Sequence, residues 1–326
     1  MAQGICIFAE TYDGVLAPCF AELLQAAREI QKTTGEEISA LVVGKNSQDI
    51  CDQVAELGVD KILLYATEED PLLQDDALAQ VLADILAEVK PSAVLAPASP
   101  IGRSIFSRVA IRLNCGLTAD CTELLVGSNP DGSHFIKHNK PSYGDNVYVT
   151  IVIREDFFPQ ILTLRPGVYE PATAEPGQAE IVTFTEPKLP ASGVKVLSQE
   201  DKVAVTDSIS SAERVVVCGK GMEAPESLEL VKEFADKIGA ALACTRPLSD
   251  VGLLPFERQI GQTGATIRPK LCISIGVSGA IQHTEGIKDT KCYIAINTDP
   301  QAAIFREAQT GIVADANDLL KVFLAK

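Results

Sequence analysis

The segment LCISIGVSGAIQH, Leu271 to His283, decides the fold class. It begins with a short apolar run, which is typical of a buried strand, and the run breaks at Gly276. Small and polar residues follow, and the last is one of only three histidines in the chain. A buried strand that leads through a glycine turn toward a helix is the repeating unit of a parallel α/β sheet. His283 is then either an unimportant residue on a helix surface or a residue that faces a molecule bound at the turn.

The same alternation continues on both sides of this segment. Leu228, Val231, Ala235 and Ile238 recur at helical spacing, and a terminal helix is expected within 318–326. We therefore predict a compact parallel α/β domain in the C-terminal part of the chain. Its strand candidates are 214–219, 241–244, 271–277, 292–297 and 311–315.

The N-terminal part shows the same alternation. Between its strands lie helix-periodic segments, which end near Gly35, Gly58, Pro91 and Asn114. This pattern indicates right-handed βαβ units and a mostly parallel sheet. The strand candidates are 4–10, 38–44, 61–66 and 93–98.

The rhythm changes between Cys121 and Phe184. Four short strand candidates, 121–127, 133–138, 146–153 and 160–166, are separated by Gly, Pro and Asn. We predict a β-rich extension of the first domain, built from a few antiparallel strands. His134 and His138 would face the same side of a hairpin there. We expect no Cys or carboxylate beside them on that side, so a metal site, which needs three or four ligands, is disfavoured.

The chain has 326 residues, which is enough for about two domains. The segment 186–201 is rich in Pro, Ser, Gly and charge and has no clear periodicity, so it is the best linker candidate. We predict an α/β protein with a first domain at 1–190, a linker at 191–207 and a second domain at 208–326.

Charge and cysteine usage exclude several classes of function. The formal charge is −16 and the sequence pI is near 4.7, so the surface would repel the phosphates of a nucleic acid. Nine scattered cysteines without a C-x-x-C pair indicate buried thiols in a reducing compartment. We see neither a secretory signal nor an apolar run of about 18 residues, and we expect a cytoplasmic protein without a transmembrane segment.

Polar groups follow the strands of the second domain. In open α/β sheets ligands lie at the carboxyl ends of the strands, and glycines there let backbone approach a phosphate. We therefore expect a nucleotide with a pyrophosphate at this edge. The residues after the five strands are Gly219-Lys220-Gly221, Thr245-Arg246-Pro247, Ser278-Gly279-Ala280 with Gln282 and His283, Asn297-Thr298-Asp299, and Asp315.

Each of these signals has another interpretation. GKGMEA, 219–224, matches the dinucleotide pattern G-x-G-x-x-A, but Thr245 and Arg246 stand where an NAD site needs an acid. GQTGATIRPK, 261–270, lacks the spacing of a Walker A motif. Arg246 could be a surface arginine, and Asp315 could be a helix cap.

Three longer blocks carry a resemblance to a known family. They are PIGRSIFSRVAIRLNCGLTADCTEL (100–124), TRPLSDVGLLPFERQIGQTGATIRPKLCISIGVSGAIQHTEGIKD (245–289) and AINTDPQAAIFREAQTGIVAD (295–315). In this order and with these gaps they strongly resemble the electron transfer flavoprotein alpha subunit, over essentially the whole chain. The resemblance implies a Rossmann-like second domain that holds FAD. It also implies a first domain that docks on a beta subunit, which itself carries AMP or a second FAD.

The resemblance also implies roles for individual residues. Arg246 matches the arginine over the flavin ring, where a cation favours the charge gained on one-electron reduction. Thr245 is the hydroxyl residue before it, and Thr263 matches a residue near flavin N5. His283 matches a histidine near the pyrimidine carbonyl. The other matched FAD-binding residues are Gln262 and Gly264 near the flavin, Ser278, Gly279, Ala280, Ile281 and Gln282 at the pyrophosphate and ribityl chain, and Lys220, Asn297 and Asp315 at the pyrophosphate and adenosine.

Two positions depart from the family pattern. Thr298 follows Asn297 where many members have lysine, which puts one phosphate contact in doubt. The segment HTEGIKD, 283–289, replaces the more familiar Leu-Ala-Gly-Met after the histidine, which could retune the flavin environment.

The implied function is that of an electron carrier, with no catalytic residue of its own and no metal. In this family FAD takes electrons from acyl-CoA dehydrogenases of fatty acid β-oxidation, or from NADH in a flavin-based bifurcating complex, and passes them on through the semiquinone. Whether the chain is a simple carrier or part of a bifurcating oxidoreductase stays open. The alternatives from other classes are an NAD(P)-dependent dehydrogenase and a redox-inactive regulatory module that binds adenine nucleotides.

Overall fold

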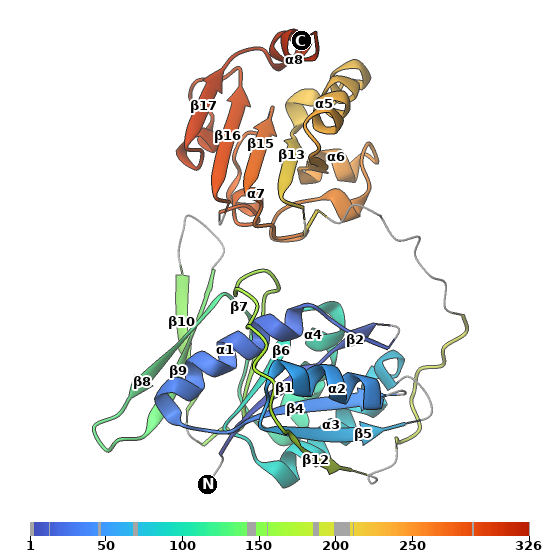
Figure 1. Cartoon of the computed structure of the whole chain (residues 1–326), viewed down its shortest axis with the longest axis vertical. Helices are drawn as coiled ribbons and strands as arrows, with labels where there is room; N and C mark the ends of the chain where they lie inside the picture. Colours follow the sequence, from blue (N-terminus) through green and yellow to red (C-terminus); the bar gives the residue numbers. More distant parts are fainter. Residues whose placement is uncertain are drawn as a thin grey trace. The chain divides into compact units, whose positions relative to one another are not determined.

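The computed structural model describes residues 3–12, 14–44, 47–67, 71–141, 148–154, 156–184, 189–198, 209–210, 212–288 and 290–325. The chain forms two compact units, Met1–Glu200 and Asp201–Lys326. Each unit is built on a parallel sheet, which confirms the predicted fold class (Figure 1). The boundary between the units falls inside the segment 191–207, which the composition marks as a linker.

The N-terminal unit contains a seven-stranded sheet in the order β12-β5-β4-β1-β6-β11-β7, and every ladder in it is parallel. The strands are β1 (Ile5–Ala9), β4 (Ile38–Gly44), β5 (Lys61–Ala66), β6 (Ala93–Pro97), β7 (Leu117–Cys121), β11 (Gln160–Leu164) and β12 (Glu180–Thr183). The helices are α1 (Cys19–Thr34), α2 (Ser47–Leu57), α3 (Asp75–Val89) and α4 (Pro100–Leu113), with the short turn η1 (Pro71–Leu73) and the small hairpin β2 (Thr11–Tyr12) and β3 (Val15–Leu16).

The helices of this unit form because their apolar residues lie on one face. In α1 the periodic residues Phe20, Leu23, Leu24, Ala27 and Ile30 are all buried. The sheet buries apolar residues on both of its sides, in two separate clusters. Helices therefore cover both faces, as a parallel sheet with fully apolar strands requires.

The β-rich extension is a separate antiparallel sheet of three strands. These are β8 (Glu123–Ser128), β9 (His134–Pro141) and β10 (Tyr148–Val152), in the order β10-β9-β8. The fourth strand candidate, 160–166, does not join it. Gln160–Leu164 is instead β11, which pairs parallel with β6 and β7 and is buried at all five residues. A short apolar run is compatible with either sheet, so local sequence could not decide between them.

The two histidines of β9 lie on one face of the strand but in different environments. His134 is exposed, whereas His138 is fully buried. The His138 Nε2 lies 3.3 Å from the Gln160 Oε1, and its Nδ1 lies 3.0 Å from the Thr118 Oγ1. A carbonyl oxygen only accepts, so Nε2–H donates to Gln160 and Nδ1 accepts from the Thr118 hydroxyl. His138 is therefore a neutral, hydrogen-bonded core residue, and no group of metal-binding side chains occurs among the described residues.

Acidification is expected to destabilise the N-terminal unit through His138. Burial lowers the pKa of His138 from 6.5 to about 4. Below pH 6.5 the unfolded chain takes up a proton that the folded chain refuses, so the unfolding free energy falls as the pH drops toward 4. The loss is at most about 3 kcal/mol. Urea unfolding of His138→Gln between pH 7 and 4 should show a flatter profile than that of the wild type.

His134→Gln is the matched control, because it removes a histidine from the same face of the same strand at an exposed position. We expect this variant to keep the pH profile of the wild type. Equal profiles for His138→Gln and the wild type would show that His138 is not the residue responsible.

The C-terminal unit is a five-stranded parallel sheet in the order β14-β13-β15-β16-β17. The strands are β13 (Arg214–Cys218), β14 (Ala241–Cys244), β15 (Leu271–Ile275), β16 (Cys292–Asn297) and β17 (Thr310–Val313). The helices are α5 (Pro225–Lys237), α6 (Arg246–Asp250), α7 (Ile281–Thr284) and α8 (Ala316–Leu324), with the short turns η2 (Lys220–Met222), η3 (Phe256–Arg258) and η4 (Ala303–Arg306).

This strand order reverses direction at β13. The chain moves from β13 to β14 on one side and then returns to β15 on the other side. The helices α5 and α8 pack together, with Phe234 against Phe323, and cover one face of the sheet (Figure 1). The other face is covered by residues of the connecting segments, such as Ile260, Ile267 and Ile304. The loops that follow β13 and β15 therefore run in opposite directions from the carboxyl edge of the sheet. This edge is where open α/β sheets bind ligands.

Two general expectations can be compared with the structure. All nine cysteines are free thiols, and most of them are buried. Within the described ranges, every helix is too short or too polar to cross a bilayer.

Candidate functional site

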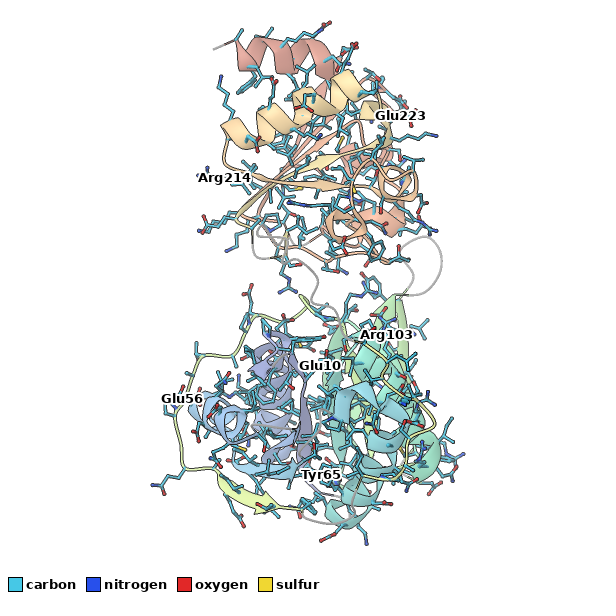
Figure 2. The ribbon with its side chains drawn as sticks, turned by 90° about the vertical axis from the view of Figure 1, so that its right-hand side faces the viewer. Glu10, Glu56, Tyr65, Arg103, Arg214 and Glu223 are labelled. Atoms are coloured by element: carbon cyan, nitrogen blue, oxygen red, sulfur yellow. The ribbon has the colours of Figure 1, made fainter. Side chains whose placement is uncertain are left out.

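A cavity of about 1020 Å³ lies at the carboxyl edge of the C-terminal sheet. It is formed by the segments that follow β13, β14, β15 and β16, together with the loop at 259–263. Figure 2 shows the two ends of β13, with Arg214 at its start and Glu223 beyond its carboxyl end, on the cavity side. The cavity therefore lies at the point where the strand order reverses. Its volume is sufficient for an extended organic ligand.

Most of the residues that the sequence singled out line this one cavity, although they come from five separate segments. Those that line it are Lys220, Thr245, Arg246, Gln262, Thr263, Ser278, Ala280, Gln282, His283 and Asn297. Those that do not are Gly264, Gly279, Ile281 and Asp315.

Asp315 has a structural role in the fold. It is the N-cap of α8, where its Oδ1 accepts hydrogen bonds from the backbone N–H groups of Asn317 at 2.8 Å and Asp318 at 3.4 Å. This is the helix-cap alternative that the sequence left open. Ile281 begins α7, and Gly264 closes the loop at 261–264 by donating its N–H to the Gly261 carbonyl at 3.0 Å.

Close backbone contact explains the glycines at the reversal point. A Cβ on Gly219 would lie 2.2 Å from the Gly276 carbonyl oxygen, and the Gly221 N–H donates to that same oxygen at 3.1 Å. Gly279 has a φ of +92°, and a Cβ there would lie 2.1 Å from the backbone nitrogen of Ile304. Gly279 does not touch the cavity, but it holds the Ser278–Ala280 turn in place against η4.

Arg246 is the first residue of α6, directly after the buried N-cap residue Thr245. The Thr245 N–H donates to the Cys218 carbonyl at 3.0 Å, which fixes this turn to the end of β13. The Arg246 side chain is 66% exposed and its Nε lies 3.3 Å from the Asp250 Oδ2. A pair that is this exposed contributes little stability, so the guanidinium is available to a ligand in the cavity.

His283, which lines the cavity, carries a side-chain nitrogen without a hydrogen-bond partner among the described residues. The residue is only 6% exposed, and its Nδ1 lies 3.1 Å from the Ile260 carbonyl oxygen, so Nδ1–H is the donor. Its Nε2 is buried and has no hydrogen-bond partner among the residues that the structure describes. Burial lowers the pKa of His283, and the Ile260 hydrogen bond opposes this in part. A buried polar atom without a partner is costly, which indicates that a ligand supplies one.

Asn297 mainly joins two loops. Its Nδ2 donates to the Val277 carbonyl at 2.8 Å, and its Oδ1 accepts from the Asp299 N–H at 3.0 Å. Asp299 and Glu223 also line the cavity, as do the cations Lys220 and Arg246. Thr298 does not line it.

Sequence reasoning missed several residues that line the cavity. They are Glu223, Gln259, Ile260, Val277, Gln301, Ala302 and Ala303, together with the backbone of Gly276. Val277 and Gly276 directly follow β15 and could have been found by the strand-end rule. Gln259 and Gln301 follow no strand, so no local signal identifies them.

Comparisons with known proteins agree with one family along the chain. Residues 5–189 match the electron transfer flavoprotein domain, and residues 208–288 match the electron transfer flavoprotein FAD-binding domain. A subunit of Acetobacterium woodii named lactate dehydrogenase (NAD(+),ferredoxin) subunit LctC is 36% identical over 99% of this chain and 76% of its own length. Electron transfer flavoprotein subunit alpha of Clostridium acetobutylicum is 35% identical, over 99% of this chain and 96% of its own. Protein FixB of Azorhizobium caulinodans is 37% identical, over 97% and 86%.

Proposed function

This chain belongs to the electron transfer flavoprotein alpha subunit family, and from this premise we propose that it holds FAD in the cavity of its C-terminal unit and carries electrons through it. The family match supports a flavin, and the cavity supplies a site of suitable size and chemistry. The observation that carries the proposal is the buried, unpartnered Nε2 of His283 on the cavity wall. A flavin offers a ring N–H and ribityl hydroxyl groups, which can donate to this acceptor nitrogen.

The residues of the cavity fit the three parts of FAD. Arg246, Thr263 and His283 line the cavity and supply a cation and hydrogen-bonding groups suited to the flavin ring. The Ser278–Ala280 turn and Gln282 suit the pyrophosphate and ribityl chain, and Lys220 adds a positive charge. Asn297 suits the adenosine side. We keep Asp315 on the adenosine side of the proposal: its Oδ1 caps α8, and it does not itself line the cavity.

When FAD is bound, it supplies the one-electron chemistry, and the protein sets how readily the flavin accepts electrons. The Arg246 guanidinium favours negative charge in its vicinity, and so supports transfer through the semiquinone. The buried His283 is neutral as it stands. A proton added at its Nε2 would place a second positive charge beside the cavity, and a negatively charged ligand would favour that proton uptake.

We further propose that the chain works with a beta subunit, on which residues 1–190 dock, and that this subunit carries AMP or a second FAD. Two relatives are named as subunits, which supports such a pairing. Two kinds of electron donor remain candidates. The resemblance favours acyl-CoA dehydrogenases of fatty acid β-oxidation, whereas a relative named for NAD(+) and ferredoxin favours a bifurcating oxidoreductase complex. We propose that either complex is cytoplasmic.

Co-production of the chain with its beta subunit tests the proposal. We expect a yellow complex whose visible spectrum shows bound flavin. Rapid reduction of two flavins per heterodimer by NADH would favour the bifurcating form, and no reaction with NADH would favour the simple carrier. A colourless complex would rule out the carrier and favour a redox-inactive nucleotide-binding module. Nicotinamide-linked turnover by the isolated chain would favour a dehydrogenase.

A further inference from the structure

Gln259 is a buried polar residue at the cavity wall that the proposed roles do not use. It is 2% exposed. Its side-chain Nε2 lies 2.9 Å from the hydroxyl oxygen of Thr263. A buried amide that contacts a hydroxyl at a ligand site can control which hydrogen bond the hydroxyl offers to the ligand.

The backbone holds Gln259 in a fixed position. It forms an isolated parallel bridge with Cys244 at the end of β14, and the next residue, Ile260, donates its N–H to the Cys244 carbonyl at 3.0 Å. The Gln259 N–H donates to the Phe256 carbonyl at 2.9 Å, and the Gln259 carbonyl accepts from the Ala265 N–H at 2.8 Å. The 259–265 loop is thereby closed at both ends, so the side chain of Gln259 is presented to Thr263 by a rigid support.

The direction of this hydrogen bond determines what Thr263 can do. An amide nitrogen has hydrogens but no acceptor lone pair, so the Gln259 Nε2–H donates and the Thr263 oxygen accepts. The hydroxyl then keeps its single hydrogen. No described residue accepts that hydrogen, and Thr263 lines the cavity.

We infer that Gln259 is a positioning residue: by donating to Thr263, it orients the threonine O–H so that it donates to an acceptor atom of the bound flavin. This inference rests on the proposed function. A fixed donor of this kind stabilises electron density that the flavin gains on reduction. Gln259 acts only through Thr263, and it transfers neither a proton nor an electron.

The opposite orientation of the amide makes the opposite prediction. If Gln259 instead presented its oxygen, the Thr263 hydrogen would be used by the protein and would be withheld from the flavin. Removing the amide would then release that hydrogen and favour reduced flavin. The sign of the change in reduction potential therefore distinguishes the two orientations.

The test uses the complex of this chain with its beta subunit, purified with FAD and titrated spectroscopically to obtain the reduction potential. Gln259→Met keeps the length of the side chain and removes its hydrogen bonds. We expect a three- to tenfold loss in the stability of reduced relative to oxidised flavin, where tenfold equals about 59 mV for a one-electron couple. The affinity for oxidised FAD should stay within about twofold, because the Thr263 hydroxyl is retained and Gln259 acts only through it.

Gln259→Glu is the second variant. An ionised carboxylate only accepts, so it would take the Thr263 hydrogen and lower the potential further than Gln259→Met does. The negative charge of the glutamate also lowers the potential. The same substitution in a Thr263→Val background, where the hydroxyl is absent, measures the effect of the charge alone. The difference between the two backgrounds is the coupling through the hydroxyl.

The control is Gln160→Met, which makes the same change at a buried glutamine of the N-terminal unit. It should leave the potential unchanged. A rise in potential in Gln259→Met, or equal effects of Gln259→Glu in both backgrounds, would overturn the inference while leaving flavin binding intact. A wild-type complex without flavin absorbance would overturn the proposed function, and the inference with it.

Discussion

Replacing Gly279 with alanine is expected to destabilise the C-terminal unit by about 3 kcal/mol, because backbone strain and overpacking act together. The φ of +92° disfavours any side chain, and the new Cβ would lie 2.1 Å from the backbone nitrogen of Ile304. Relief of that clash must move the Ser278–Ala280 turn, whose outer residues line the cavity. We therefore expect weaker flavin retention as well as a lower urea midpoint.

Gly252→Ala separates strain from clash. Gly252 has a similar φ of +74°, but a Cβ there would have no atom within 4 Å. This variant should lose only about 1–2 kcal/mol, the cost of the left-handed backbone, and should keep its flavin. Equal losses in the two variants would show that the contact between the turn and η4 contributes nothing.

Replacing Arg246 with alanine is expected to leave the fold intact and to destabilise the one-electron-reduced flavin about tenfold, or about 1.4 kcal/mol. The side chain is 66% exposed and pairs with Asp250, so stability should change little. Because the Arg246 guanidinium is exposed, solvent weakens its electric field. We therefore expect a smaller effect on the reduced flavin than removal of a buried hydrogen-bond donor would have. A reductive titration of the complex, followed by its visible spectrum, measures the yield of this state.

Two variants serve as controls for Arg246. Arg246→Lys keeps the charge without the planar guanidinium and should retain part of the yield. Arg154→Ala removes an arginine of the N-terminal unit that is 78% exposed and pairs with Asp156. Arg154→Ala should not change the yield of the one-electron-reduced flavin. An unchanged yield in Arg246→Ala would mean that another group stabilises the reduced flavin.

Much of the fold follows from local sequence, because each βαβ unit carries its own periodicity. The buried face of α1 and the left-handed glycine that ends it, Gly35, are examples. What local sequence could not supply is the choice of strand partners. Gln160–Leu164 has the apolar pattern of a strand, but only tertiary contacts insert it between β6 and β7. Glu180–Thr183, at the edge beside β5, has no pattern strong enough to be expected at all.

The candidate site shows the same limit. Residues directly after strands, such as Lys220, Thr245 and Ser278, could be grouped in advance because parallel strands end at one edge. The same rule also selected Asp315, since a cap residue and a ligand residue occupy the same position after a strand. Gln259 was missed because a bridge to Cys244, not a strand end, brings it to the cavity.

The cavity draws all of its described lining residues from 220–303, within a single unit. A ligand that binds only the folded form adds to its stability, by about 1.4 kcal/mol for each tenfold excess over the dissociation constant. Because the described lining residues all belong to the C-terminal unit, that gain is expected to stabilise this unit. The resistance of the C-terminal unit to heat and to proteolysis is therefore expected to rise with the supply of cofactor.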